Sequence, residues 1–196
     1  MYVRDAKNRE EVWLLDHIEE MGLDDAAFRS RDYVIALDED THEKAGFGRT
    51  RIHKTDEGRY CELTGIGVLP AWRGQGVGAH VVERLVAKAA DDGFDVVYSF
   101  TDAPDYLTQF GFEPVESSEL PAKLQERLAA KREEAMENAV AMRIDVDEFS
   151  MPLRLREAFK EAEPHQGEER EPEESPEDFG IDSESATYKY DTGGRR

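Results

Sequence analysis

The segment from Val68 to Ala79, VLPAWRGQGVGA, places an arginine and three glycines between an expected strand and an expected helix. Glycine has no Cβ, so the main-chain N–H groups of Gly74, Gly76 and Gly78 can approach a ligand closely. The first N–H groups of the following helix lack partners, and its N-terminus carries partial positive charge. Together these features predict a binding site for a phosphate group.

The glycines of this loop fit two phosphate-binding motifs. Gly74-x-Gly76-x-x-Ala79 fits a relaxed dinucleotide fingerprint, but that fingerprint follows its strand directly and opens a series of parallel βαβ units. Here Pro-Ala-Trp-Arg intervenes, and alternating strands precede it. The preferred frame is Arg73-x-x-Gly76-x-Gly78. A glycine-rich turn that binds nothing is the structural alternative.

The hydrophobic pattern on either side of the loop predicts one mixed α/β domain over residues 1–146. Strands are expected at 2–4, 33–37, 44–54, 59–69, 96–100 and 139–146. Helices are expected at 9–21, 24–28, 77–91, 105–110 and 119–137. Gly65 and Gly67 interrupt one strand, which predicts a bulge or a close approach of a ligand.

The C-terminal part of the chain has a different composition. Residues 147–162 are expected to add a helical extension to the domain. Residues 163–196 are rich in Pro, Glu, Asp and Gly, so an acidic, disordered tail is expected there.

The charge balance is strongly acidic. The chain has 45 acidic and 25 basic residues, a net charge of −20. Such a chain repels nucleic acid and anionic lipid, so neither is expected as a partner. An acid excess with few lysines is similar to proteins of salt-accumulating halophiles, in which salt screens the repulsion. A protein with an ordinary core and an acidic tail is the alternative.

Other global features predict a cytoplasmic protein without a metal. The start of the chain lacks an apolar signal segment, and no apolar run is long enough to span a membrane. The single Cys61 cannot form an internal disulfide, and no cluster of Cys and His suggests a metal site.

The Arg73-x-x-Gly76-x-Gly78 frame resembles the acyl-CoA pyrophosphate loop of the GNAT (Gcn5-related) N-acetyltransferases, and Phe110-Gly111-Phe112 is similar to their second signature. The resemblance implies a mixed central sheet with helices on both faces and two splayed strands, here 59–69 and 96–100. It also implies acetyl-CoA as cosubstrate and acetyl transfer to a primary amine by direct attack in a ternary complex. By the same resemblance, Val68 would face the pantetheine arm, and the pyrophosphate would be bound by Arg73, Gly74, Gln75, Gly76, Val77 and Gly78.

Within that family the chain is similar to the acetyltransferase domain of N-acetylglutamate synthases. The likeness rests on Cys61-Glu62-Leu63 before the loop and on the run from Thr101 to Leu107 before Gly111-Phe112. The chain departs from those enzymes because the cysteines that often follow the Leu-Pro pair, here Leu120-Pro121, are absent. An amino-acid kinase domain, which many of them carry, is also not expected here.

Two residues are the catalytic candidates. Glu62 is expected to be the general base, directly or through a water, and a solvated strand carboxylate is the alternative. Tyr106 is the candidate acid for the CoA thiolate. Relatives place a tyrosine where this chain has Leu107, and one step on a helix rotates a side chain by about 100°, so Tyr106 could instead point into the core. His53 and His80 are further base candidates, both expected at the surface.

The sequence says less about the acceptor molecule than about the cosubstrate. Four arginines, Arg29, Arg31, Arg49 and Arg51, fall near the expected acceptor cleft and could hold a carboxylate or pair with surface acids. A primary amine of a small molecule such as an amino acid, or of a protein, is the expected acceptor. Protein N-terminal or lysine acetylation and a non-catalytic acyl-CoA-binding regulatory domain remain alternatives. The interpretation also admits a homodimer.

Overall fold

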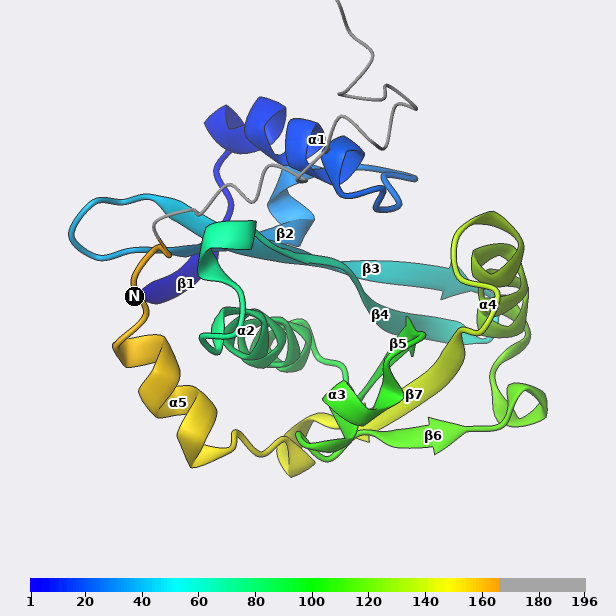
Figure 1. The fold of residues 1–196 in the computed structure, drawn as a ribbon. Coiled ribbons are helices and arrows are strands. Elements are labelled where there is room, and N and C mark those ends of the chain that lie inside the picture. The colour runs from blue at the N-terminus through cyan, green and yellow to red at the C-terminus, as the bar shows by residue number, and fades with distance from the viewer. Residues whose placement is uncertain (166–196) are drawn as a thin grey trace, which may run out of the picture. The chain divides into compact units, whose positions relative to one another are not determined.

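The computed structural model describes residues 1–165, so nearly all of the expected tail lies outside the described residues. The strands are β1 (Tyr2–Asp5), β2 (Tyr33–Leu37), β3 (Lys44–Thr55), β4 (Gly58–Val68), β5 (Val96–Thr101), β6 (Glu113–Val115) and β7 (Val140–Asp145). The helices are α1 (Glu11–Glu20), α2 (Val77–Asp91), α3 (Pro104–Thr108), α4 (Ala122–Glu134) and α5 (Leu153–Lys160). The predicted mixed α/β architecture is confirmed (Figure 1).

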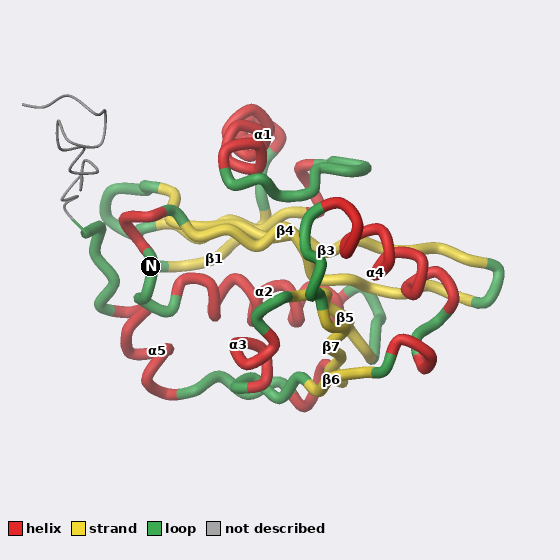
Figure 2. The backbone as a smooth tube through the Cα atoms, turned by 45° about the vertical axis from the view of Figure 1, so that its right-hand side comes forward, coloured by secondary structure: helices red, strands yellow, loops and turns green. Residues whose placement is uncertain are grey.

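The strands form one sheet in the order β1-β2-β3-β4-β5-β7-β6. Its neighbouring strands are antiparallel except for the parallel pair β4–β5. That pair is short, because β5 is in register with β4 only from Cys61 to Leu63, while β4 runs on to Val68. The two strands therefore diverge toward their C-terminal ends. This divergence is the splay expected of strands 59–69 and 96–100 (Figure 2).

A bulge in β4 lies where the divergence begins. Phe47 is opposite Gly67 and Arg49 is opposite Thr64, so β4 holds one residue more than β3 between these pairs. Gly65 has a φ of +58°, in the left-handed region that favours glycine. The predicted irregularity at Gly65 and Gly67 is therefore confirmed as a bulge, which adds local twist to β4.

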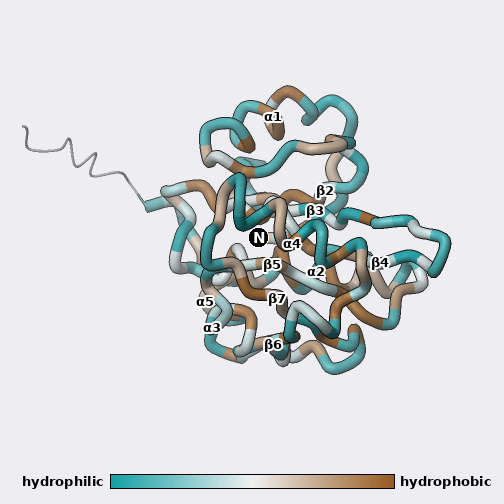
Figure 3. Tube along the Cα trace, turned by 90° about the vertical axis from the view of Figure 1, so that its right-hand side faces the viewer, coloured by the Kyte–Doolittle hydropathy of each residue, from teal (hydrophilic) through white to brown (hydrophobic). Residues whose placement is uncertain are grey.

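Helices cover both faces of the sheet. α2 packs on β1–β4, and its buried residues join the main core with Cys61 and Leu63 of β4. α1 packs on the other face through Leu14 and Ile18. α4 packs through its leucines on a cluster that includes Phe100 of β5. Along α1, hydrophobic and hydrophilic residues alternate around the helix, as expected for an element with one buried side (Figure 3).

The alternation of side chains along β4 sends alternate residues to opposite faces. Cys61 and Leu63 join the core beneath α2, whereas Glu62 and Thr64 lie on the face that carries α4. Cys61 is fully buried, and burial raises the pKa of its thiol to about 12. None of the described helices is long and apolar enough to cross a bilayer.

One predicted helix is wrong. Residues 24–28 do not form a helix but a turn, in which the Asp24 carboxylate accepts a hydrogen bond from the Ala26 N–H at 2.8 Å. Aspartate commonly bonds to the main chain in this way and so competes with helix formation. The short β6 was also missed, because a three-residue strand containing Pro114 gives little hydrophobic signal.

The remaining helices are close to prediction. α2 has the expected bounds, 77–91. α4 is shorter than the expected 119–137, because Pro121 precedes its first residue. α5 falls within the expected extension at 147–162, while the domain boundary at residue 146 stays a prediction.

Candidate acetyl-transfer site

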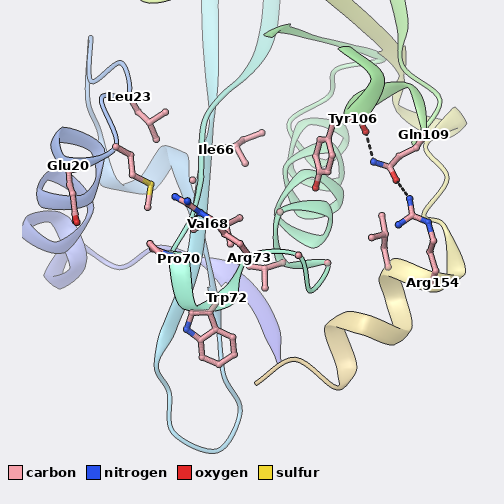
Figure 4. A pocket seen from close by; sticks show the side chains of 17 residues that line it. Glu20, Leu23, Ile66, Val68, Pro70, Trp72, Arg73, Tyr106, Gln109 and Arg154 are labelled. Atoms are coloured by element: carbon pink, nitrogen blue, oxygen red, sulfur yellow. Dashed lines mark hydrogen bonds between the residues drawn. The ribbon is translucent and has the colours of Figure 1, made fainter. Parts of the chain in front are cut away.

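Two cavities lie along the diverging strands. The first is a cleft of about 790 Å³ between the end of β4, the loop that follows it, α3 and α5 (Figure 4). The second has a volume of about 360 Å³ and lies between β4, β5 and the C-terminal end of α4. Leu23, Ile66 and Tyr106 line both cavities. A ligand that extends along the first cleft can therefore present one end to a second molecule in the other cavity.

The loop after β4 presents unpaired main-chain donors to the first cleft. The N–H groups of residues 74–78 have no main-chain hydrogen-bond partner within residues 1–165. The Arg73 N–H, in contrast, already donates to the Pro70 carbonyl at 3.3 Å. Gly74 and Gly76 have φ values of +76° and +77°. Left-handed residues of this kind turn successive N–H groups toward one side and form an anion-binding concavity, here at the N-terminus of α2.

The side chains of the loop have different environments. Arg73 donates through Nε to the Val68 carbonyl at 3.1 Å, and both residues line the first cleft. Val77 lines it too, although its side chain is fully buried. The side chain of Gln75 instead bonds to the main chain of Glu163. Among the predicted cosubstrate residues, only Gln75 is thus absent from the lining of the cleft.

Tyr106 stands where the two cavities meet. It is 41% exposed, whereas the next residue, Leu107, is 5% exposed and belongs to the core. The expectation that Tyr106 could point into the core is therefore wrong. Its hydroxyl lies 3.0 Å from the position that a Cβ would take on Gly78. Burial raises the pKa of Tyr106, so the phenol keeps its proton at neutral pH.

Glu62 lies in a buried group of charges. It is 0% exposed, and it contacts His53 Nε2 at 2.8 Å, Arg127 Nε at 3.1 Å and Lys131 Nζ at 3.3 Å. Burial alone would raise the pKa of Glu62, but the hydrogen bond from His53 and the charges of Lys131 and Arg127 hold it at about 2. A carboxylate with so low a pKa is a weak base.

This environment argues against a direct catalytic role for Glu62, while action through a water stays a prediction. The residue lies on the predicted strand, but it lines neither of the two cavities, so the structure does not support direct removal of a proton from the acceptor. His53 and His80 are also not at the surface, since both side chains are buried. His53 contacts Glu62, and His80 bonds through Nδ1 to the Gly76 carbonyl at 2.9 Å.

Asp24 links this group to the second cavity. Its carboxylate pairs with Arg127, with Arg51 at 3.3 Å and with Arg49 at 3.8 Å, and it lines the cavity with Arg127. Burial opposes ionisation, but the Ala26 N–H and Arg127 lower the pKa of Asp24. The other two predicted arginines, Arg29 and Arg31, line a separate surface pocket and not the acceptor cavity.

No group of three or more His, Cys, Asp or Glu side chains suited to a metal ion occurs within residues 1–165.

The sequence of this chain matches the model of a known protein family. Residues 2–112, more than half of the sequence, match the model of the acetyltransferase (GNAT) family. The chain belongs to this GNAT family. Its class is that of an acetyl-CoA-dependent N-acetyltransferase, as the resemblance implied.

Solved structures share this GNAT fold. Rv2747 from Mycobacterium tuberculosis, in complex with CoA, is 16% identical with a TM-score of 0.61, over 74% of this chain and 99% of that one. N-acetylglutamate synthase from Neisseria gonorrhoeae, complexed with coenzyme A and N-acetyl-glutamate, is 17% identical with a TM-score of 0.57. The match covers 74% of this chain and 34% of that one. Arabidopsis thaliana Naa50, in complex with a bisubstrate analogue, is 14% identical with a TM-score of 0.52. The match covers 73% of this chain and 97% of that one.

Sequence reasoning missed the partners that α4 supplies to this GNAT domain. Arg127 and Lys131 are four residues apart, so they share one face of the helix with Leu124 and Leu128. All four side chains are buried. A basic pair in register with buried leucines was the available signal, because it predicts cations directed toward a buried acid.

Replacing Glu62 tests the buried charge group. Glu62→Gln leaves Arg127 and Lys131 without their shared anion, which costs about 3–5 kcal/mol of the free energy of unfolding at pH 7. Because the folded pKa is lowered, this stabilisation is complete above the unfolded pKa of about 4.3 and is lost as the pH falls toward 2. Urea unfolding at pH 7, 4.5 and 3 should therefore show that the difference in unfolding free energy between wild type and Glu62→Gln becomes smaller as the pH falls.

The matched control is Glu126→Gln, which removes an exposed carboxylate on the same helix that carries Arg127. It should change stability by less than about 1 kcal/mol at every pH. A Glu62→Gln gap that is small or independent of pH would contradict the described contacts.

Proposed function

We propose that this chain transfers the acetyl group of acetyl-CoA to a primary amine of a small molecule, by direct attack in a ternary complex. The observation that carries the proposal is the meeting of two cavities at Tyr106. One cavity has unpaired main-chain donors at its far end, and the other has room for a second substrate. This arrangement brings the thioester and the amine together without a covalent enzyme intermediate.

CoA would lie along the first cleft. The N–H groups of Gly74, Gln75, Gly76, Val77 and Gly78 would bind the diphosphate, with Arg73 beside them. The open edge of β4 at Val68 would face the pantetheine arm, since β5 no longer pairs with β4 there. The acetyl thioester would reach Tyr106 and Ile66, where a main-chain donor of β4 could stabilise the oxyanion.

The acceptor would occupy the second cavity. Its volume of about 360 Å³ falls at the lower end of the range of small-molecule sites. Most of the lining area is apolar, and the charged residues that line the cavity are Asp24, Asp102, Glu134, Arg127 and Lys131. An amine with an apolar body and a carboxylate, such as an amino acid, fits this lining better than an extended protein segment.

Gly78 gives the sharpest test of the cosubstrate site. Gly78 lies in the first turn of α2, between Val68 and Tyr106, and a side chain there would project into the cleft. Gly78→Asp would set a carboxylate against the diphosphate and should weaken CoA binding at least a hundredfold by titration calorimetry. Ala87→Asp adds the same charge at an exposed position of α2 and should leave binding unchanged. Equal affinities of the two variants would exclude this site.

Tyr106 is the proposed acid that protonates the CoA thiolate. Tyr106→Phe retains the ring and its edge-on contact with Phe110 but removes the proton. We expect kcat to fall about a hundredfold, the lower range for a general acid, with little change in the KM for acetyl-CoA. Tyr98→Phe, a hydroxyl loss at a residue that lines neither cavity, should leave kcat unchanged. An unchanged kcat for Tyr106→Phe would mean that the thiolate leaves without this acid.

The proton of the amine would pass to solvent water. Cationic neighbours lower the pKa of both Asp24 and Glu62, so neither carboxylate is a strong base at neutral pH. With a saturating thioester, kcat/KM for the acceptor should rise about tenfold per pH unit up to the pKa of the free amine. The measurement compares acceptors of different amine pKa. If the pH profile of kcat/KM instead has the same midpoint, near pH 6–7, for every acceptor, a base on the enzyme removes the proton.

The two alternatives predict different outcomes of one assay. Release of free CoA thiol is followed with amino acids, polyamines and basic peptides as acceptors. Turnover on small amines supports the proposal, and turnover restricted to peptides supports the protein acetyltransferase. CoA binding without turnover on any acceptor would support a non-catalytic regulatory domain.

The net charge of −20 supports the further proposal that the protein works in high salt, so these assays belong in molar KCl. A melting temperature that does not rise with KCl would contradict it. Cytoplasmic location and a homodimer stay predictions.

A further inference from the structure

The C-terminal segment after β7 packs against the loop that would bind the CoA diphosphate. The side chain of Gln75 donates to the Glu163 carbonyl at 2.8 Å and accepts from the Glu163 N–H at 3.0 Å. The His165 N–H donates to the Ala71 carbonyl at 2.8 Å. These contacts join segments far apart in the sequence, and Glu163 and His165 lie outside the residues 2–112 that match the family.

α5 is fixed to the start of α2 by three further contacts. Phe159 stacks on His80 with ring centroids 3.8 Å apart and an angle of 11° between the planes. Arg156 pairs with Glu83 at 2.7 Å. A Cβ on Gly76 would collide with the Leu155 carbonyl oxygen, so the glycine lets α5 approach the loop directly. These contacts therefore hold Arg154, the residue before Leu155, beside the unpaired N–H groups of residues 74–78.

That residue, Arg154, lines the first cleft. Figure 4 places Arg154 and Gln109 on the side of the pocket formed by α5 and α3, away from Val68 and Arg73 on the β4 side. Within residues 1–165, Arg154 has one side-chain hydrogen bond, from Nη2 to Gln109 Oε1 at 2.5 Å. Its partner is a neutral amide, so the positive charge of Arg154 is not matched by an ion pair there.

The charged residues that line the first cleft favour an anionic ligand. The charged residues that line the first cleft are Arg73, Arg154 and Glu20. The cleft thus has two cations and one anion in a chain of net charge −20. A guanidinium has five N–H donors and binds phosphate oxygens with two at once. Exchanging the neutral amide of Gln109 for a phosphate is electrostatically favourable.

We propose that Arg154 binds the diphosphate of CoA from the side opposite β4, so that α5 supplies part of the cosubstrate site. This inference rests on the proposed function. An effect through Tyr106 is the competing explanation, because burial raises the pKa of that tyrosine and the charge of Arg154 offsets part of the rise. Such an effect would act on every thioester, whereas contact with the diphosphate acts only on thioesters that contain one.

The experiment uses three thioesters of decreasing length. They are acetyl-CoA, acetyl-3′-dephospho-CoA, which keeps the diphosphate, and S-acetyl-pantetheine, which has no phosphate. Arg154→Gln is compared with Arg154→Lys and with Lys160→Gln, which removes an exposed cation from the same helix and breaks only its pair with Glu157. The readouts are kcat/KM for each thioester and the Kd of CoA.

Arg154→Gln should lower kcat/KM for the first two thioesters about ten- to hundredfold, and raise the Kd of CoA by a similar factor. It should leave kcat/KM for S-acetyl-pantetheine unchanged. Arg154→Lys should recover part of the loss because the charge is kept. Lys160→Gln should stay within about threefold of wild type throughout.

Three outcomes would overturn the inference alone. The same loss with S-acetyl-pantetheine would place the effect at Tyr106 or in the packing of α5. A loss that disappears with the dephospho compound would place Arg154 on the 3′-phosphate. An unchanged Arg154→Gln variant would remove it from the site. A wild type that does not bind CoA would overturn the proposed function as well, which separates the two failures.

Discussion

The early end of the pairing between β4 and β5 is the constraint on which the site depends. After Leu63 and Ser99 the two strands are no longer paired, and the bulge at Gly65 adds twist to β4 at that point. The unpaired edge of β4 exposes main-chain donors and acceptors that a ligand can use. Both cavities form along this edge, and the N-terminus of α2 lies at the end of the first one. The strand separation thus brings the anion site, the open edge and Tyr106 into one cleft.

The buried charges on the face of β4 that carries α4 hold the second cavity in shape. Arg127 contacts both Glu62 on β4 and Asp24 in the turn after α1, so one side chain of α4 connects three parts of the chain. Removing either acid would leave a cation without its partner in a buried place, which is costly. This linkage gives Glu62 a clear structural role. Strand position alone suggested a catalytic one.

Local sequence features were enough to predict much of this molecule. The apolar period of α2, the run in β5 and the glycines at 65 and 67 gave the elements and the bulge, because these signals depend on residues close in sequence. The helix predicted at 24–28 is wrong, because the Asp24 carboxylate bonds to the Ala26 N–H and holds a turn there. The loop was predicted as a phosphate site from its glycines and the helix that follows, and the family resemblance added CoA as the ligand and Tyr106 as the acid. The environment of Glu62 could not be predicted, because its partners Arg127 and Lys131 lie far along the chain and only folding brings them together.

The single cysteine of the chain has a practical consequence. Cys61 is enclosed between β4 and α2, and its thiol keeps its proton far above neutral pH. Thiolates, not thiols, attack disulfide and maleimide reagents. The folded polypeptide should therefore be invisible to colorimetric sulfhydryl dyes. Any colour that develops in solution reports the small-molecule product, and a slow background signal would report unfolding of the protein.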